Sequence, residues 1–98
     1  MSQHASARWL VTYDITDDRI RMRVFKLLKK NGVPVQYSVF FVHASAAQMG
    51  ILMGRLGTLI DKGADDVRAY RLPEDPWKVT MGATILPKSV WIDARATL

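Results

Sequence analysis

Hydrophobic residues follow a helical period in two stretches of the chain and a strand-like pattern in the segments between them. Residues 9–14 are aromatic and β-branched with two mostly apolar faces, which is typical of a central β-strand. From Ile20 onward, apolar residues recur at positions i, i+4, i+7 and i+8 until Asn31-Gly32, a pair that favours a left-handed helix end. The pattern predicts a helix over 17–30, with Thr16 as its N-cap and two carboxylates in its first turn.

The second half of the chain continues this alternation. Residues 35–43 are strongly β-forming, and their periodicity alone predicts one strand. Ser45 and Gln48 form a capping-box pattern, and the apolar stripe that follows predicts a helix over about 46–62. Apolar and polar residues alternate over 66–72, which predicts a strand with one solvent-exposed face. Residues 77–82 and 89–92 are further short candidate strands.

This order of elements predicts an α+β fold with both helices on one face of a sheet. Two helices cover one face only, yet the two strongest strands are apolar on both faces. A twofold-related copy of the same sheet would cover the opposite face. We therefore predict a homodimer.

The composition narrows the chemistry available to the chain. It contains no cysteine, which excludes disulfides, zinc knuckles, iron–sulfur clusters and thiol nucleophiles. A Ser-His-Asp arrangement, a Gly-rich phosphate loop and a His-x-x-x-His pair are also absent from the sequence. The longest apolar run is 39–42, and the first residues lack the features of a signal peptide. We expect a cytoplasmic protein that makes no membrane contact.

Positive charge is concentrated in the first third of the chain. The net charge is +5, and residues 1–31 hold seven basic and three acidic residues. On the helix predicted over 17–30, one row of cations lies beside the apolar stripe and Arg21 lies on the other flank. The row consists of Arg19, Arg23, Lys26 and Lys30. Such a row can follow the phosphates of a nucleic acid, and a solvated helix face is an equally good interpretation.

Asp14 ends the first predicted strand just before a helix begins, where functional groups often collect. Capping accounts for Asp17 and Asp18, so a magnesium or manganese site here needs Asp14 from both copies of the dimer. By spacing alone, a carboxylate that joins the local turn is the better interpretation. The aromatic residues could stack on bases, although core or interface packing explains them more often. They are Trp9, Tyr13, Tyr37, Phe40 and Phe41.

Three segments of the sequence stand in a specific order and spacing: Tyr13-Asp14-Ile15-Thr16-Asp17-Asp18, Arg21-x-Arg23-Val24, and the run from Gly32 to Phe40. In this order and spacing they resemble the CRISPR-associated protein two family, the small subunit of the spacer-acquisition machinery. The resemblance covers about residues 9–82. It implies a ferredoxin-like βαββαβ domain that forms a homodimer with its sheets face to face. It also implies that the 35–43 segment is two strands, a short one near Val35-Gln36 and a longer one over about 38–43.

The length of 98 residues predicts one domain over 1–98. In it, 1–7 are expected to be disordered, 8–72 to form the ferredoxin-like core, and the β-rich tail over 77–98 to lie in the dimer interface. The partners implied are the CRISPR integrase, which is CRISPR-associated protein one, together with duplex DNA and possible RNA ligands. The implied role is spacer acquisition from foreign DNA.

The activity that the resemblance implies is metal-dependent cleavage of phosphodiester bonds in RNA or duplex DNA, with Mg²⁺ or Mn²⁺ on Asp14. Other family site positions match Tyr13, Arg21, Arg23 and Phe40. The predicted nucleic-acid-binding residues are Arg19, Arg21, Arg23, Lys26 and Lys30.

The sequence departs from the family pattern at two positions. Pro34 stands where many members carry a basic residue, and Phe41 stands where Glu is usual. A contact to the nucleic-acid backbone and a second acidic group are therefore missing, which weakens the nuclease prediction more than the assembly prediction. A non-catalytic, DNA-binding scaffold for the integrase is the alternative.

Overall fold

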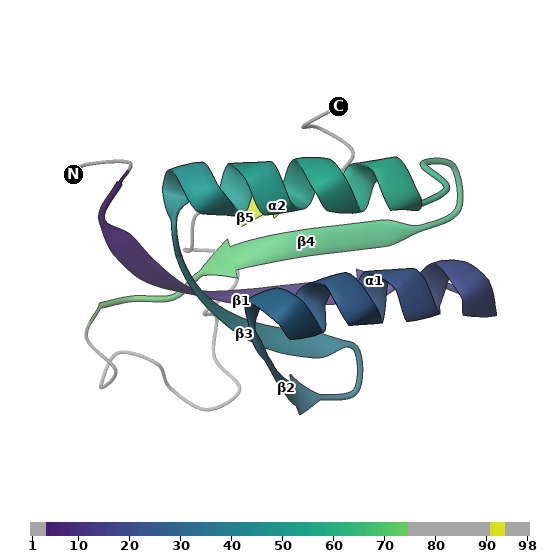
Figure 1. The fold of residues 1–98 in the computed structure, drawn as a ribbon, viewed down its shortest axis with the longest axis horizontal. Coiled ribbons are helices and arrows are strands. Elements are labelled where there is room, and N and C mark those ends of the chain that lie inside the picture. Colours follow the sequence, from purple (N-terminus) through teal and green to yellow (C-terminus); the bar gives the residue numbers. More distant parts are fainter. Residues whose placement is uncertain (1–3, 75–90, 94–98) are drawn as a thin grey trace.

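Five strands form one antiparallel sheet, and two helices lie on one of its faces, in a computed structural model that describes residues 4–74 and 91–93 (Figure 1). The sheet order is β2-β3-β1-β4-β5. The elements are β1 (Ser6–Asp14), α1 (Asp18–Asn31), β2 (Val33–Gln36), β3 (Val39–Ser45), α2 (Ala46–Leu59), β4 (Asp66–Arg71) and β5 (Trp91–Asp93). The predicted α+β, ferredoxin-like βαββαβ order is confirmed, and β1 is central as predicted.

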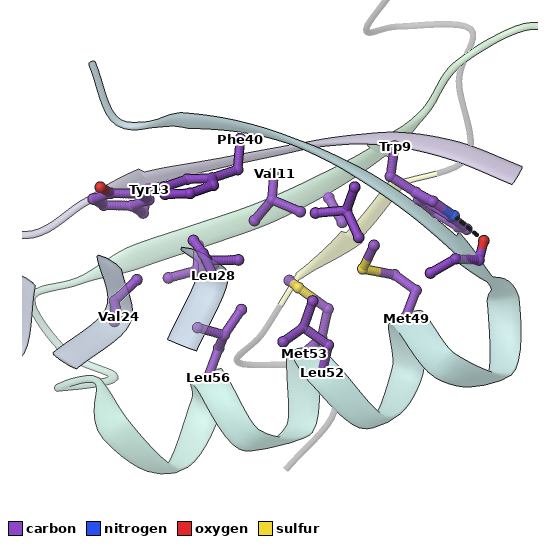
Figure 2. Packing of buried hydrophobic residues seen from close by; sticks show 14 of the residues in the cluster. Trp9, Val11, Tyr13, Val24, Leu28, Phe40, Met49, Leu52, Met53 and Leu56 are labelled. Carbon is purple, nitrogen blue, oxygen red and sulfur yellow. Dashed lines mark hydrogen bonds between the residues drawn. The ribbon is translucent and has the colours of Figure 1, made fainter. Parts of the chain in front are cut away.

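The hydrophobic core lies between the sheet and the helices (Figure 2). Alternation along β1 directs Trp9, Val11 and Tyr13 toward the helices, where all three are buried. The Trp9 indole Nε1 donates a hydrogen bond to the Ala44 carbonyl oxygen at 2.9 Å, so its buried polar atom is satisfied. Neither helix in the described part of the chain is long and apolar enough to span a membrane.

The ends of α1 differ from the sequence prediction in two ways. Asp17, not Thr16, is the N-cap, because its carboxylate accepts hydrogen bonds from the backbone N–H groups of Arg19 and Ile20. Gly32 is extended and not left-handed, with φ −164°. A Cβ atom on Gly32 would lie 2.3 Å from the Phe41 carbonyl oxygen, so this residue is needed for a close approach to β3.

The second helix begins as predicted and ends earlier. The capping box between Ser45 and Gln48 is present in both directions. The helix ends at Leu59 rather than near residue 62, because Ile60 is already extended and the next residues form a separate turn. In that turn the Asp65 carboxylate accepts from the Asp61 N–H at 2.8 Å, which competes with further helical hydrogen bonds.

The single strand that periodicity predicts over 35–43 is wrong, and the two strands implied by the family resemblance are present as β2 and β3. The chain turns at Tyr37 and Ser38, and Ser38 adopts a positive φ of 62°. The Tyr13 N–H donates to the Ser38 carbonyl oxygen at 3.1 Å and anchors this turn to β1. A run of β-forming residues thus makes a hairpin because β1 holds its turn, which periodicity along one strand does not reveal.

The expected limits of the domain need one correction at the amino end. Ser6 and Ala7 were expected to be disordered, but they belong to β1 and pair with Ser45 and Ala44 of β3. Ala7 also packs against the core, which explains why the strand extends this far. Of the expected tail strands, 77–82 lies outside the described residues, and 89–92 overlaps β5, which pairs with β4.

The sheet face opposite the helices carries an apolar row that crosses three central strands. Phe41 of β3 is in register with Leu10 of β1, and Leu10 is in register with Tyr70 of β4. All three are half-buried in the single chain. We call this surface the open face. Phe41, which departs from the family pattern, adds to its apolar area.

Candidate functional site

The strand-end carboxylate of Asp14 lies at the corner of the open face where β1 ends. Asp14 is exposed, and alternation places it on the same face as Leu10 and Thr12. Its carboxylate makes no hydrogen bond or ion pair with another residue that the structure describes. The reading of Asp14 as a residue that joins the local turn is therefore wrong, and its oxygen atoms face solvent.

A second carboxylate lies next to Asp14 across the sheet. Asp66 of β4 is its antiparallel partner, and Asp66 accepts from the Arg68 Nε at 2.9 and 3.2 Å. These hydrogen bonds are the first cause of the raised pKa of the Arg68 guanidinium. Sequence reasoning did not pair Asp14 with Asp66, since only the register of β1 and β4 brings them together.

The chemistry of Asp14 fits a hard divalent cation, because Mg²⁺ and Mn²⁺ prefer carboxylate and water oxygens. Within the described residues, no group of three or more His, Asp or Glu side chains gathers as a complete metal site. One chain thus supplies too few ligands. The sequence analysis expected a further carboxylate from Asp14 of a second copy.

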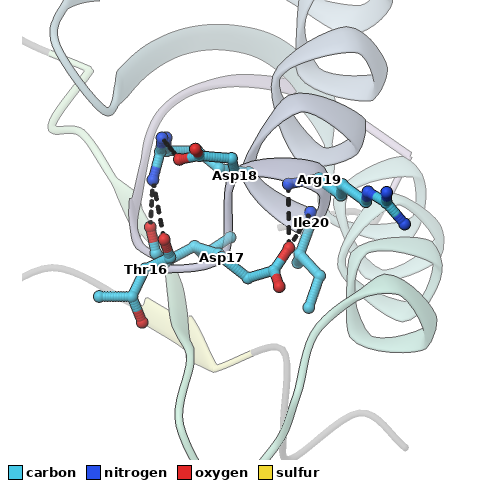
Figure 3. A network of polar contacts seen from close by, with 7 residues as sticks. Thr16, Asp17, Asp18, Arg19 and Ile20 are labelled. Carbon is cyan, nitrogen blue, oxygen red and sulfur yellow. Dashed lines mark hydrogen bonds and ion pairs between the residues drawn. The ribbon is translucent and has the colours of Figure 1, made fainter.

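The Arg21 side chain holds the loop that follows Asp14. Figure 3 shows Thr16 and Asp17 of this loop. The Arg21 Nη1 donates to the carbonyl oxygens of Ile15 at 3.0 Å and Thr16 at 3.3 Å. The Nη2 of the same guanidinium forms an ion pair with Asp18. Arg21 was predicted as a catalytic and nucleic-acid-binding residue, and the structure places its guanidinium on the backbone of residues 15–16 next to Asp14. In this position it orders the connection between β1 and α1.

The N-cap carboxylate of Asp17 lies on the other side of the same loop (Figure 3). It accepts from the backbone N–H groups of Arg19 at 2.9 Å and Ile20 at 3.0 Å. The hydrogen bond from Ile20 is the first cause that lowers the pKa of Asp17 below its usual value. Asp17 therefore serves the helix, which agrees with the sequence analysis.

The four predicted cations of α1 are all accessible. Arg19, Arg23, Lys26 and Lys30 are exposed, and their spacing places them on one side of α1. None of the described carboxylates forms an ion pair with them within 4 Å. Their charges are therefore available to an anionic partner.

Two predicted site residues are part of the core. Phe40 is 1% exposed, and its ring centroid lies 6.4 Å from that of Tyr13. Tyr13 is also buried, and burial is the first cause that raises the pKa of its phenol. From this position Phe40 supports Tyr13 and the strand that ends in Asp14.

Comparisons with known proteins agree with one another. The family model of "CRISPR associated protein Cas2" matches residues 7–80. The chain is 34% identical over 90 residues to "CRISPR-associated endoribonuclease Cas2 1" of Nitrosomonas europaea, and the match covers 92% of this chain and 86% of the relative. It is 45% identical over 65 residues to a similarly named protein of Chloroflexus aurantiacus, over 66% of this chain and 70% of that one.

Solved structures show the same similarity. The crystal structure of Streptococcus pyogenes Cas2 matches with a TM-score of 0.65 and 30% identity, over 76% of this chain and 99% of that one. A hypothetical protein from Thermus thermophilus matches with a TM-score of 0.70 and 31% identity, over 82% and 98% of the two chains.

Proposed function

The chain belongs to the Cas2 family of CRISPR-associated proteins, and from this membership we propose that it acts in CRISPR adaptation as a metal-dependent endonuclease on RNA or duplex DNA. The relatives named above carry the word endoribonuclease in their names. The observation that carries the catalytic part is the exposed Asp14 carboxylate, which no other described residue engages.

The dimer supports the active site in this proposal. Two copies that meet through their open faces cover the apolar row of Phe41, Leu10 and Tyr70. Because Asp14 lies at a corner of the same face, a twofold axis near that corner brings two Asp14 side chains together. Asp66 stands beside each Asp14, with its charge balanced by Arg68.

The two Asp14 side chains would hold a divalent cation, which would supply a water of lowered pKa and neutralise charge on the scissile phosphate. The chain's own residues do the rest. Arg21 orders the backbone of residues 15–16, and this fixes the backbone position from which the Asp14 side chain extends. Arg19, Arg23, Lys26 and Lys30 hold the phosphates of the nucleic acid by charge, without reading its sequence.

A non-catalytic scaffold for the integrase is the second candidate function. The observation that favours it is the accessible row of cations on α1, which holds duplex DNA whether or not Asp14 binds a metal. Both functions need this row, and only the nuclease needs Asp14.

The replacement of Asp14 by Asn tests the catalytic part. We expect Asp14→Asn to abolish Mg²⁺- or Mn²⁺-dependent cleavage of labelled RNA and duplex DNA, because the anionic ligand is lost. Affinity for the nucleic acid should stay equal or rise slightly, and circular dichroism should show an unchanged fold. The control is Glu74→Gln, which removes another exposed carboxylate and should cleave as the wild type does. Cleavage that survives in Asp14→Asn would favour the scaffold.

Sedimentation tests the dimer separately. At micromolar concentration we expect a mass of roughly 22 kDa, twice the 11.1 kDa of the chain, as a closed twofold pair gives. Leu10→Lys places a charge in the middle of the open face and should shift the protein to monomer. Ile51→Lys, at an exposed position on α2, should leave the mass unchanged. A wild-type monomer would remove the proposed metal site as well.

A further inference from the structure

A pocket of about 460 Å³ opens between the first half of α1 and the hairpin of β2 and β3. Its volume is within the range of sites that hold small molecules or parts of larger ligands. Its walls are mainly aromatic and apolar. They include Tyr13, Met22, Phe25, Gln36, Tyr37 and Phe40. We call this the hairpin pocket.

Two large side chains of the hairpin pocket are exposed to water. Tyr37 is 85% exposed and Met22 is 53% exposed. Below them Phe25 and Phe40 pack edge to face, with ring centroids 5.5 Å apart. Figure 2 shows Tyr13 beside Phe40 at the same end of the core, with its hydroxyl directed away from the other labelled side chains. A flat ring between Tyr37 and this floor would cover apolar surface that the single chain leaves in water.

The hairpin pocket also offers polar groups without partners. The side chains of Gln36, Tyr37 and Ser38 make no hydrogen bond to another described residue, and neither does the Tyr13 hydroxyl. An amide and hydroxyl groups around aromatic walls match the donor and acceptor edge of a nucleobase. An apolar side chain from a protein partner would leave these groups unpaired.

The turn that carries Tyr37 is held in a conformation of some cost. Ser38 adopts φ 62°, a region that residues other than glycine rarely occupy. The hydrogen bond from the Tyr13 N–H fixes this turn over the pocket. Backbone strain of this kind persists only where the surrounding structure holds the residue in place, and such residues cluster at active sites and ligand-binding sites.

The charge around the hairpin pocket favours a nucleotide over a neutral ring. The Lys29 Nζ lies 5.8 Å from the centroid of the Phe25 ring. Arg21 and Asp18, which form an ion pair with each other, also line the pocket. Lys26 follows Met22 on the next turn of α1 and is exposed. A phosphate attached to a base in the pocket would meet the positive charges of Lys26 and Lys29, which are both exposed.

From these observations we propose that the hairpin pocket binds one unstacked nucleobase of a single-stranded RNA or DNA segment, whose backbone follows the cations of α1. This inference rests on the proposed function only in taking nucleic acid as the ligand. It gives the aromatic residues near Asp14 a role in substrate binding, and it predicts a preference for strands whose bases are free to leave a stack.

The test compares strands that differ only in their bases. Fluorescence anisotropy in EDTA measures the affinity of the full chain for a 12-nucleotide oligoadenylate and for an abasic 12-mer of equal charge. The ribose and deoxyribose series are both measured. We expect the wild type to bind the strand with bases about 5- to 150-fold more tightly, the range that one base–aromatic stack gives. Tighter binding of the strand with bases in either series supports base binding in the hairpin pocket. The series with the larger affinity ratio identifies the preferred nucleic acid.

Variants connect this advantage to the hairpin pocket. Tyr37→Ser should lose most of the advantage and should bind the abasic strand as the wild type does. The control Ile51→Ser removes another exposed apolar side chain, outside this pocket, and should keep the advantage. Asp14→Asn should also keep it, so a loss of cleavage and a loss of base binding are distinguishable.

Three outcomes would overturn the proposal. Equal affinity of the wild type for both kinds of strand in both series would mean that only the backbone is bound. An unchanged advantage in Tyr37→Ser would place the bases elsewhere. The third outcome combines two results: the wild type is a dimer that binds both strands equally, and Tyr37→Ser sediments as a monomer. This outcome would identify the pocket as a contact between copies of the chain.

Discussion

Arg21 and Arg23 lie two residues apart on α1, and we expect their replacement by Ala to have opposite consequences. The Arg21 guanidinium donates to two carbonyl oxygens of the loop after Asp14 and pairs with Asp18. Arg23 is exposed and belongs to the row of cations. The two positions therefore separate a residue that orders the loop from one that is available to phosphates.

The structure sets the expected size of the effect. A hydrogen bond from a charged donor contributes about 1.5–3 kcal/mol when buried, and a surface ion pair contributes about 0–1 kcal/mol. The Arg21 side chain is 33% exposed and that of Asp18 is 88% exposed, so screening by solvent reduces both contributions. We expect Arg21→Ala to lower the free energy of unfolding by about 1–2 kcal/mol, and Arg23→Ala to change it by less than about 0.5 kcal/mol.

Binding to duplex DNA should show the reverse order. Each lost phosphate contact flattens the plot of log affinity against log salt by about one unit. Arg23→Ala should show this change, and Arg21→Ala should leave the slope near its wild-type value. Arg21→Lys keeps the charge but lacks the planar fork that reaches two carbonyl oxygens, so it should also lower the stability without a change in slope.

Urea unfolding followed by circular dichroism, together with binding titrations at several salt concentrations, measures both quantities on the same proteins. The assignment of Arg21 to the loop would be wrong if Arg21→Ala flattened the salt plot as much as Arg23→Ala and left the unfolding free energy unchanged. It would also be wrong if Arg21→Lys restored full stability.

Two further predictions concern the helices. Gly32→Ala should lower the unfolding free energy by about 1–3 kcal/mol in urea titrations, because its Cβ would lie 2.3 Å from the Phe41 carbonyl oxygen. Gly54→Ala should raise the unfolding free energy by about 1 kcal/mol, because no atom lies within 4 Å of its Cβ. Equal effects of the two substitutions would contradict the close approach at Gly32. The lowered pKa of Asp17 means that its carboxylate stabilises the fold above pH 3.8 and that this stabilisation is lost as the pH falls through the lower folded-state pKa. Thermal unfolding of the wild type and Asp17→Asn should therefore differ in pH dependence below pH 3.8, and parallel curves would exclude a charged cap.

Local signals in the sequence determined the helices, the central strand and the cations. The apolar period of α1, the capping box of α2 and the aromatic, β-branched residues of β1 each act within a few residues, so a linear pattern contains them. The accessibility of the α1 cations follows from the same period, because a residue outside the buried stripe of a helix faces solvent. Asp14 was identified as a candidate through its family resemblance and its place at the end of a strand.

Tertiary structure decided the features that depend on register and close approach. Gly32 resembles a helix stop in the sequence, yet its lack of a side chain is needed because β3 passes next to it. The turn at Tyr37 and Ser38 divides one β-forming run because the Tyr13 N–H holds it from another strand. Asp66 becomes a neighbour of Asp14 only after the chain has folded back on itself. Such contacts join residues whose separation along the chain contains no periodic signal, so only the three-dimensional arrangement specifies them.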